Sequence, residues 1–241
     1  MRVRAAIFGF LCLTLSAWSQ LTYTVPVTDK SEPGNPVKIS GTASFSELVL
    51  ADSVTSSSNF LVEARNVSGK AIILLLGYFD EAGPYGGGTR HLIEVDHFFW
   101  GEIDPGLSFV LARSHPGTRI LDLHASPSEP VSAPKAEVNV EYVEFLDGSS
   151  YGDATVANDI HEMRTVMFDA LRRIDRAGST EEFQGLLEEK IQPDAADSLL
   201  AAIRHTEKRY GVAAARRQIH TAIFVAEQRT RALRVFERAR K

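Results

Sequence analysis

The sequence predicts an α+β protein of two domains, an N-terminal antiparallel β-sandwich followed by a C-terminal α-helical bundle or hairpin. Short apolar runs with a period of two recur from residue 37 to residue 145, and after Gly152 the apolar period changes to between three and four. The two halves also differ in charge. We expect a leader at residues 1–19, the sandwich at 20–152 and the helices at 153–241.

The leader has the features of a secretory signal peptide. Arg2 and Arg4 precede an apolar run at residues 5–15, and Ala17 and Ser19 supply small residues before a cut after Ser19. The run is shorter than the roughly twenty apolar residues that a membrane-spanning helix needs. Removing 19 of the 241 residues leaves a mature chain of 222, which we expect in the bacterial periplasm or outside the cell, without a transmembrane segment.

Cysteine use agrees with export of a chain that is stable without disulfides. The one cysteine, Cys12, lies inside the apolar run, so the mature chain has none. A lipoprotein needs a small residue just before its cysteine, and Leu11 stands there instead. We therefore predict a Sec-type signal peptide and no lipid anchor.

The sandwich is expected to contain strands separated by Gly, Pro, Ser and Asn clusters. The run 71–79 is apolar on both alternating faces, which predicts a central strand covered on both sides. Serine runs at 53–58 and 126–132, the glycine tip at 85–88 and the Pro-rich tract at 125–134 are interpreted as loops. The expected strands are 37–39, 44–50, 60–66, 71–79, 91–99, 107–111, 119–123 and 136–145.

The last of these strands changes its apolar parity. Val138, Val140 and Tyr142 share one face, whereas Val143 and Phe145 fall on the other if the alternation continues. One extra residue near Tyr142 restores the inward face, so the pattern predicts a β-bulge or sharp twist there.

Four helices are expected in the second half. The first carries an apolar stripe from Val156 to Ile174, and Gly178 follows it as a C-cap. The second begins at Ser179 or Thr180 and stops near Pro193. The third runs over about 194–210, and the fourth from 212 almost to the end of the chain. Met163, Met167, Phe224 and Phe236 are assigned to the buried side.

The turns of the first half resemble a known class of module. The segments 66–72 (NVSGKAI), 77–80 (GYFD) and 103–106 (IDPG) are similar to turns of immunoglobulin-like modules in exported bacterial proteins, including those of the FxLYD type. The resemblance covers about half of the mature chain and rests on turn chemistry. It implies an immunoglobulin-like sandwich with a binding or structural role in a secreted bacterial protein, and it supplies no catalytic residue.

The residues capable of catalysis or metal binding form no convincing site. His91 and His97 are about 20 Å apart on an extended strand, too far to bind one ion together. His115 and His124 are expected in solvated positions. The carboxylates of Glu141, Glu144 and Asp147 and the helix face of His161, Glu162 and Arg164 are likewise interpreted as solvent-exposed. We expect no catalytic residue, cofactor or metal ligand.

Charge is distributed unevenly along the chain. Residues 20–152 contain 8 basic and 17 acidic residues, and residues 204–241 contain 11 basic and 3 acidic residues. This basic stretch is either a solvated surface, a contact within or between chains, or a binder of anionic membrane or polymer. Nucleic acid is not an expected partner, because few aromatics alternate with the arginines. The candidate anion or partner contacts are Arg216, Arg217, Arg229, Arg231, Arg234 and Arg238.

These observations favour an exported, non-enzymatic binding or structural protein of the bacterial cell envelope, with an envelope protein or a second copy of the chain as its partner. Two alternatives stay open. One is a hydrolase with its site at the junction of the two domains, where pockets tend to form. The other is a peripheral binder of anionic membrane or polymer through the basic C-terminal helix.

Overall fold

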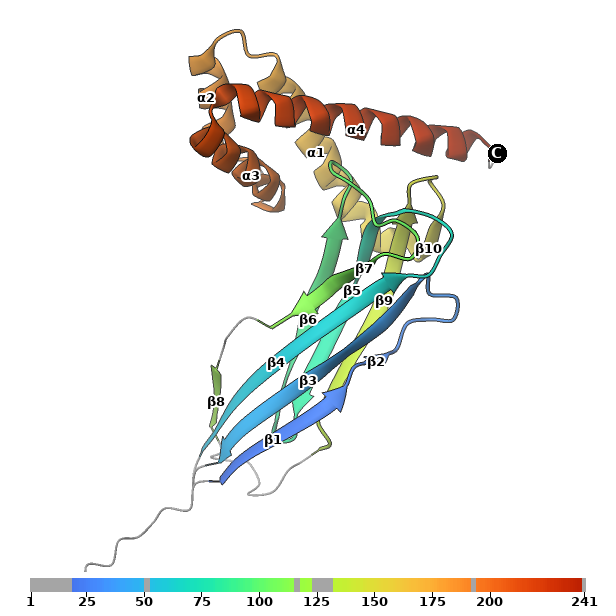
Figure 1. The fold of residues 1–241 in the computed structure, drawn as a ribbon, viewed down its shortest axis with the longest axis vertical. Helices are drawn as coiled ribbons and strands as arrows, with labels where there is room; N and C mark the ends of the chain where they lie inside the picture. Colours follow the sequence, from blue (N-terminus) through green and yellow to red (C-terminus); the bar gives the residue numbers. More distant parts are fainter. Residues whose placement is uncertain (1–18, 50–52, 115–117, 123–131, 192–193, 240–241) are drawn as a thin grey trace, which may run out of the picture.

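In a computed structural model of the chain, two antiparallel β-sheets face each other and helices pack at one end of them (Figure 1). The structure describes residues 19–49, 53–114, 118–122, 132–191 and 194–239. The expected signal peptide therefore lies almost wholly outside the described residues, as do His115 and His124. The α+β fold class, with a β-sandwich followed by helices, is confirmed.

Within the described ranges each sheet has five strands, and neighbouring strands are antiparallel except where β2 joins β9. The first sheet has the order β1 (Ser19–Pro26), β3 (Val37–Val49), β4 (Ser53–Asn66) and β7 (Ser108–Arg113), with β8 (Thr118–Asp122) also paired to β4. The second has the order β10 (Ser150–Gly152), β9 (Lys135–Phe145), β5 (Ile72–Gly83) and β6 (Gly86–Asp96), with β2 (Thr28–Asp29) on β9.

Strand β5 is the central strand that its doubly apolar sequence predicts. It pairs with both β9 and β6. One of its faces, with Ile72, Leu75 and Phe79, fills the core between the sheets, while Leu74 and Leu76 point the other way against the start of the helical region. Both faces of β5 are therefore covered from Ile72 to Leu76, and this part of the strand carries no polar side chain.

A β-bulge in β9 resolves the parity change that the sequence shows. Leu76 pairs with Tyr142, but the next residue of β5, Gly77, pairs with Val140, so Glu141 is the extra residue. Beyond the bulge Val143 returns to the core between the sheets, and Tyr142 lies on the opposite, outer face. The predicted bulge is confirmed.

Two glycines make room for this bulge. A Cβ atom at Gly77 of β5 would lie 2.3 Å from the carbonyl oxygen of Asn139, and one at Gly152 of β10 would lie 1.8 Å from that of Glu141. Gly152 also has a φ of +83°, which L-residues rarely adopt. The strands on both sides of β9 therefore approach the bulge more closely than any side chain allows.

Several strands are longer than the sequence indicated. The expected strands 37–39 and 44–50 are one continuous strand, β3, and the serine run at 53–58 is not a loop but the first part of β4. Ser56 and Ser58 point inward and donate hydrogen bonds to Glu47 and Glu81, respectively. The composition of this run suggested a loop, but its hydroxyls donate hydrogen bonds to carboxylates inside the sandwich.

Three further boundaries differ from the expectation. Strands β1, β2 and β10 were not predicted at all. The glycine tip belongs to β6, and the turn before it consists of Pro84 and Tyr85. At its other end β6 stops at Asp96, so that Phe98 and Phe99 leave the sheet and pack against the helices.

The helical region follows the sequence prediction closely, except that the C-cap of the first helix is Arg176 and not Gly178. A short 3-10 turn, η1 (Ala154–Ala157), leads into α1 (Asn158–Asp175), and Ser179 caps α2 (Thr180–Glu188) by accepting a hydrogen bond from the backbone N–H of Glu182. Helix α3 (Asp194–Tyr210) is followed by Gly211, with a φ of +82°, and by the long α4 (Val212–Ala239). None of the helices in the described ranges combines the length and apolar character needed to cross a bilayer.

Candidate functional site

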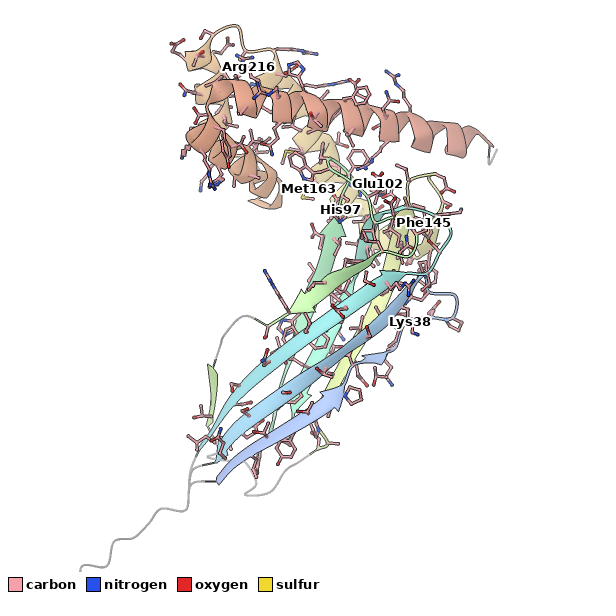
Figure 2. All side chains as sticks on the ribbon, viewed as in Figure 1. Lys38, His97, Glu102, Phe145, Met163 and Arg216 are labelled. Carbon is pink, nitrogen blue, oxygen red and sulfur yellow. The ribbon has the colours of Figure 1, made fainter. Side chains whose placement is uncertain are left out.

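The junction of the sandwich and the helices is built on a shared apolar core. Ile73 of β5 and Phe98 and Phe99 of the loop after β6 are buried together with side chains from all four helices. Met167 is 2% exposed in this core and Met163 packs against it, as the sequence predicted. In Figure 2, His97, Glu102 and Met163 lie at the level where the two parts meet.

Arg164 of α1 lies at the centre of a buried ion-pair network in this junction. Its guanidinium donates to both carboxylate oxygens of Asp96 on β6, at 3.0 and 2.8 Å, and to Glu144 Oε2 on β9, at 2.8 Å. It also lies 4.4 Å above the ring of Phe98. His161, one turn earlier on α1, places Nε2 3.2 Å from the same oxygen of Glu144.

The expectation that Glu144 and Arg164 are solvent-exposed is wrong. Their side chains are 4% and 5% exposed. The bulge at Glu141 is the reason for Glu144, because it turns that side chain to the outer face of the sheet, which η1 and α1 cover. Arg164 lies one turn after Ile160, which packs against the outer face of the sheet, so both lie on the face of α1 that meets the sheet.

The electrostatics of the network balance burial against charge. Burial by itself raises the pKa of Glu144, but the hydrogen bond with His161 and the charge of Arg164 outweigh it and hold the pKa below its ordinary value. Burial lowers the pKa of Arg164, and Asp96 and Glu144 more than offset that effect, so its pKa is raised. Glu144 and Arg164 therefore face each other as a charged pair at neutral pH.

Arg229 of α4 makes a second polar contact across the junction. Its guanidinium donates to the backbone carbonyls of His97 and Gly101 and, at 2.8 Å, to Glu102 Oε2. The side chain is 4% exposed, and burial, opposed by the charge of Glu102, lowers its pKa. The loop after β6 is thus bound by Arg229 of α4, while the end of β6 is bound by Arg164 of α1.

The other candidate arginines fall into three groups. Arg216 donates to the carbonyls of Ala177 and Ser179, at 3.0 and 3.3 Å, and its guanidinium lies 4.5 Å from the ring centre of Phe183, so it closes the turn between α1 and α2. Arg217 and Arg231 are exposed. The side chains of Arg234 and Arg238 lie outside the described residues, although α4 continues through both positions.

The histidine-containing strand does not assemble as a unit. His91 places Nε2 3.1 Å from Glu81 Oε1 and stacks on Phe79, with ring centres 5.8 Å apart. His97 lies just beyond the end of β6, where its backbone carbonyl accepts from Arg229. Among the described residues, no three His, Cys, Asp or Glu side chains are arranged to hold a metal ion.

Two carboxylates lie inside the sandwich. Glu47 and Glu81 are 1% and 3% exposed. Glu47 Oε1 accepts from Ser56, at 3.1 Å, and lies 2.5 Å from the place that a Cβ of Gly83 would occupy, so the side chain crosses to the opposite sheet. Burial raises the pKa of Glu47, and the hydrogen bond from Ser56 offsets only part of that rise. These buried acids were not recognised in the sequence.

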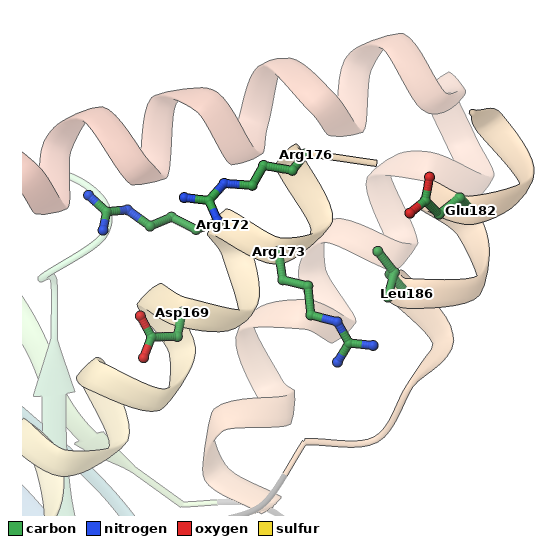
Figure 3. Close-up of a pocket in the computed structure, with 6 residues that line it drawn as sticks. All are labelled: Asp169, Arg172, Arg173, Arg176, Glu182 and Leu186. Atoms are coloured by element: carbon green, nitrogen blue, oxygen red, sulfur yellow. The ribbon is translucent and has the colours of Figure 1, made fainter. Parts of the chain in front are cut away.

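A surface hollow of about 540 Å³ lies between α1 and α2 (Figure 3). Three arginines line it, but two of them are committed elsewhere: Arg172 pairs with Glu227 at 2.7 Å, and Arg173 with Glu189 at 2.9 Å. Asp169 and Glu182 add negative charge to the lining. The hollow therefore has no net preference for an anion.

Comparison with protein-family models, with curated proteins and with solved structures gives no match to this chain.

Proposed function

We propose that the chain is an exported, non-enzymatic binding or structural protein of the bacterial cell envelope. One observation carries the proposal: the side chains at the junction that are suited to acid–base chemistry, Asp96, Glu144 and His161, are tied to Arg164 or to one another. The hydrogen bonds of these side chains hold the helices on the sandwich. Their role is therefore structural, whereas in an enzyme such side chains would face a substrate.

We further propose that the sandwich is an immunoglobulin-like module. If β3, β4, β5, β6, β7, β9 and β10 are equated in chain order with strands A, B, C, C′, E, F and G, the first sheet has the order A-B-E. The second has the order G-F-C-C′. These neighbours agree with those of immunoglobulin sandwiches, in which B pairs with E and the other sheet is built on G, F and C. Strand β1 is then an addition at the edge beside β3.

The turn between β4 and β5 also supports this assignment. Asn66 is fully buried and donates to the carbonyls of Lys70 and Ile103, at 2.8 and 2.9 Å, while its own side-chain oxygen accepts from the backbone and hydroxyl of Ser68. The hydrogen bonds of Asn66 thus fix the conformation of the NVSGK segment, which connects one sheet to the other. Because both amide hydrogens of Asn66 are used, the sequon at this position is not open to a glycan in the folded chain.

Expression of the full chain with a C-terminal tag in a bacterium, followed by fractionation, tests export. The expected product begins at Gln20 and is recovered with the periplasm or envelope. A product that keeps Met1 and stays in the cytoplasm contradicts the proposal. Cross-linking of the exported chain in intact envelopes tests the binding role. A specific adduct to an envelope component supports it, and uncross-linked monomer at all concentrations contradicts it.

The hydrolase alternative has its own test. The exported chain is assayed against ester, peptide and glycoside substrates beside His161→Ala and Glu144→Gln. The proposal expects no turnover above a blank. Turnover that both substitutions abolish, while the variants still fold, would establish an enzyme at the junction and overturn it.

A further inference from the structure

Helix α4 lies across the end of the molecule opposite the start of β1, and the sandwich lies on one side of it (Figure 1). The stripe of α4 that faces the rest of the protein consists of Ala215, Ile219, Ala222, Ala226 and Arg229, each at most 4% exposed. The opposite side of the helix therefore faces away from both the sandwich and the helical core.

That opposite side carries a line of exposed cations with an aromatic residue between them. Arg217, Phe224 and Arg231 are seven residues apart, close to two helical turns, so they lie above one another on one face. Phe224 is 62% exposed, which corrects its assignment to the buried side. We call Arg217, Thr221, Phe224, Gln228 and Arg231 the α4 outer face; all five are exposed.

The two arginines of the α4 outer face differ from Arg216 and Arg229, the other two arginines of this helix whose side chains the structure describes. Arg216 and Arg229 are engaged with carbonyls and, for Arg229, a carboxylate of the same chain. Within the described part of the chain, Arg217 and Arg231 have no hydrogen bond or ion pair through their side chains. The helix thus separates the arginines that hold the fold together from those that are open to a partner.

We propose that the α4 outer face binds the surface of an anionic lipid bilayer. The guanidinium groups of Arg217 and Arg231 would pair with headgroup phosphates, and the Phe224 ring would enter the interfacial region between them. The inference rests on the proposed envelope role and gives it a partner. It concerns surface attachment, because the apolar stripe of α4 is already used inside the protein.

The size and shape of this face favour a membrane over a protein. From Arg217 to Arg231 the helix extends about 21 Å, and a single helix face of that length is smaller than the roughly 800 Å² per partner of a stable protein interface. A lipid surface needs no such area, because each cation near anionic headgroups adds to attachment separately. The face also lies at an end of the molecule, where a flat surface can approach it (Figure 1).

Co-sedimentation of the exported chain with vesicles tests the inference. The vesicles contain either phosphatidylcholine alone or phosphatidylcholine with 30% phosphatidylglycerol. We expect attachment to the anionic vesicles only, and its release by about 0.5 M NaCl, since salt screens such contacts. Each arginine contributes about fivefold, so the double variant R217Q/R231Q should bind about 25-fold more weakly. Phe224→Ala should weaken binding several-fold.

Matched controls stand on the sandwich. Lys38 and Arg113 are exposed cations, and Leu92 is an apolar side chain that is 65% exposed. The variants K38Q/R113Q and Leu92→Ala should bind within twofold of the unaltered chain. All variants alter exposed positions, and circular dichroism confirms that they fold.

Three results would overturn the inference. They are equal binding to neutral vesicles, losses as large in the sandwich controls as in the α4 variants, and attachment to an acidic polypeptide such as polyglutamate in place of vesicles. Cross-linking in intact envelopes separates this failure from that of the proposed function. An adduct to an envelope protein, together with no attachment of the unaltered chain to anionic vesicles, would retain the envelope role and reject the lipid partner.

Discussion

Arg164 of α1 and Glu144 of β9 form an ion pair with an N–O distance of 2.8 Å, and both side chains are at most 5% exposed. The pair joins the helical region to the sandwich. Asp96 of β6, on the other side of β5 from β9, forms a second ion pair with Arg164. Phe98 and Phe99 also pack against apolar side chains of the helices at this junction. The ion pairs fix the orientation of α1 on the sheet, because Arg164 reaches both carboxylates in one orientation only.

Loss of the central cation should be costly. Arg164→Leu leaves Asp96 and Glu144 buried without a counter-charge, and we expect the free energy of unfolding to fall by about 3–5 kcal/mol. Urea unfolding followed by circular dichroism measures this. Arg173→Leu is the matched control, because the Arg173–Glu189 pair is 63% and 48% exposed and should contribute less than about 1 kcal/mol. Equal losses in the two variants would contradict this account of the junction.

The elements of the fold could largely be predicted from periodicity, and the junction could not. Helix ends at Ser179 and Gly211 follow from local capping chemistry, and the parity change near Tyr142 indicated the bulge. The burial of Glu144 depends on which face α1 covers, and that is a tertiary fact. Two features of the sequence, taken together, indicate that Glu144 and Arg164 meet. The bulge turns Glu144 to the outer face of the sheet, and Arg164 lies one turn after the apolar Ile160, which packs on that face.

Serine-rich and aromatic positions misled for a related reason. The run at 53–58 has the composition of a loop, but Ser56 and Ser58 hydrogen-bond to Glu47 and Glu81 from a strand. Phe224 is an aromatic residue of a type common in cores, but the helical period places it opposite the buried stripe of α4. For Phe224 the residue type and the helical period disagreed, and the period was correct. The run at 53–58 has one apolar residue, Val54, so no apolar period could identify it as a strand.

The junction should weaken in acid through Glu144. Its pKa is lower in the folded chain than in the unfolded one, so its contribution is complete above the unfolded value and is lost as the pH falls through the folded value. Unfolding free energies of the unaltered chain and Glu144→Gln are compared from pH 7 to pH 3. We expect the difference between them to be greatest at pH 7 and to shrink below about pH 4. A difference that stays constant with pH would show that Glu144 does not act through its charge.

Glu47 should show the opposite sign. Its pKa is raised by burial, so the folded chain keeps its proton at pH values where the unfolded chain has lost it, and stability falls as the pH rises through that interval. Glu47→Gln removes the buried charge and should raise the free energy of unfolding at pH 7, with no gain in acid. Glu63→Gln, at an exposed position of β4, should change it by less than about 0.5 kcal/mol. Destabilisation by Glu47→Gln at pH 7 would mean that Glu47 is paired as an anion.

Closure of the sheet around the bulge should depend on Gly152. Alanine there meets the carbonyl of Glu141 and must adopt a φ of +83°, and we expect a loss of more than about 2 kcal/mol. Gly69→Ala is the control, because no atom lies within 4 Å of the position its Cβ would take. Thermal unfolding of the two variants compares them, and similar midpoints would contradict the close approach of β10 to β9.

The central claim is that the ion-pair network makes the helices and the sandwich one cooperative unit. Native-state hydrogen exchange measures this at the amides of Leu171 in α1 and Val143 in β9, both fully buried. The account predicts that the two amides exchange with the same free energy, within about 1 kcal/mol, in the unaltered chain, and that the Leu171 amide exchanges more readily than the Val143 amide in Arg164→Leu. An unaltered chain in which the helices already open several kcal/mol below the sandwich would contradict it.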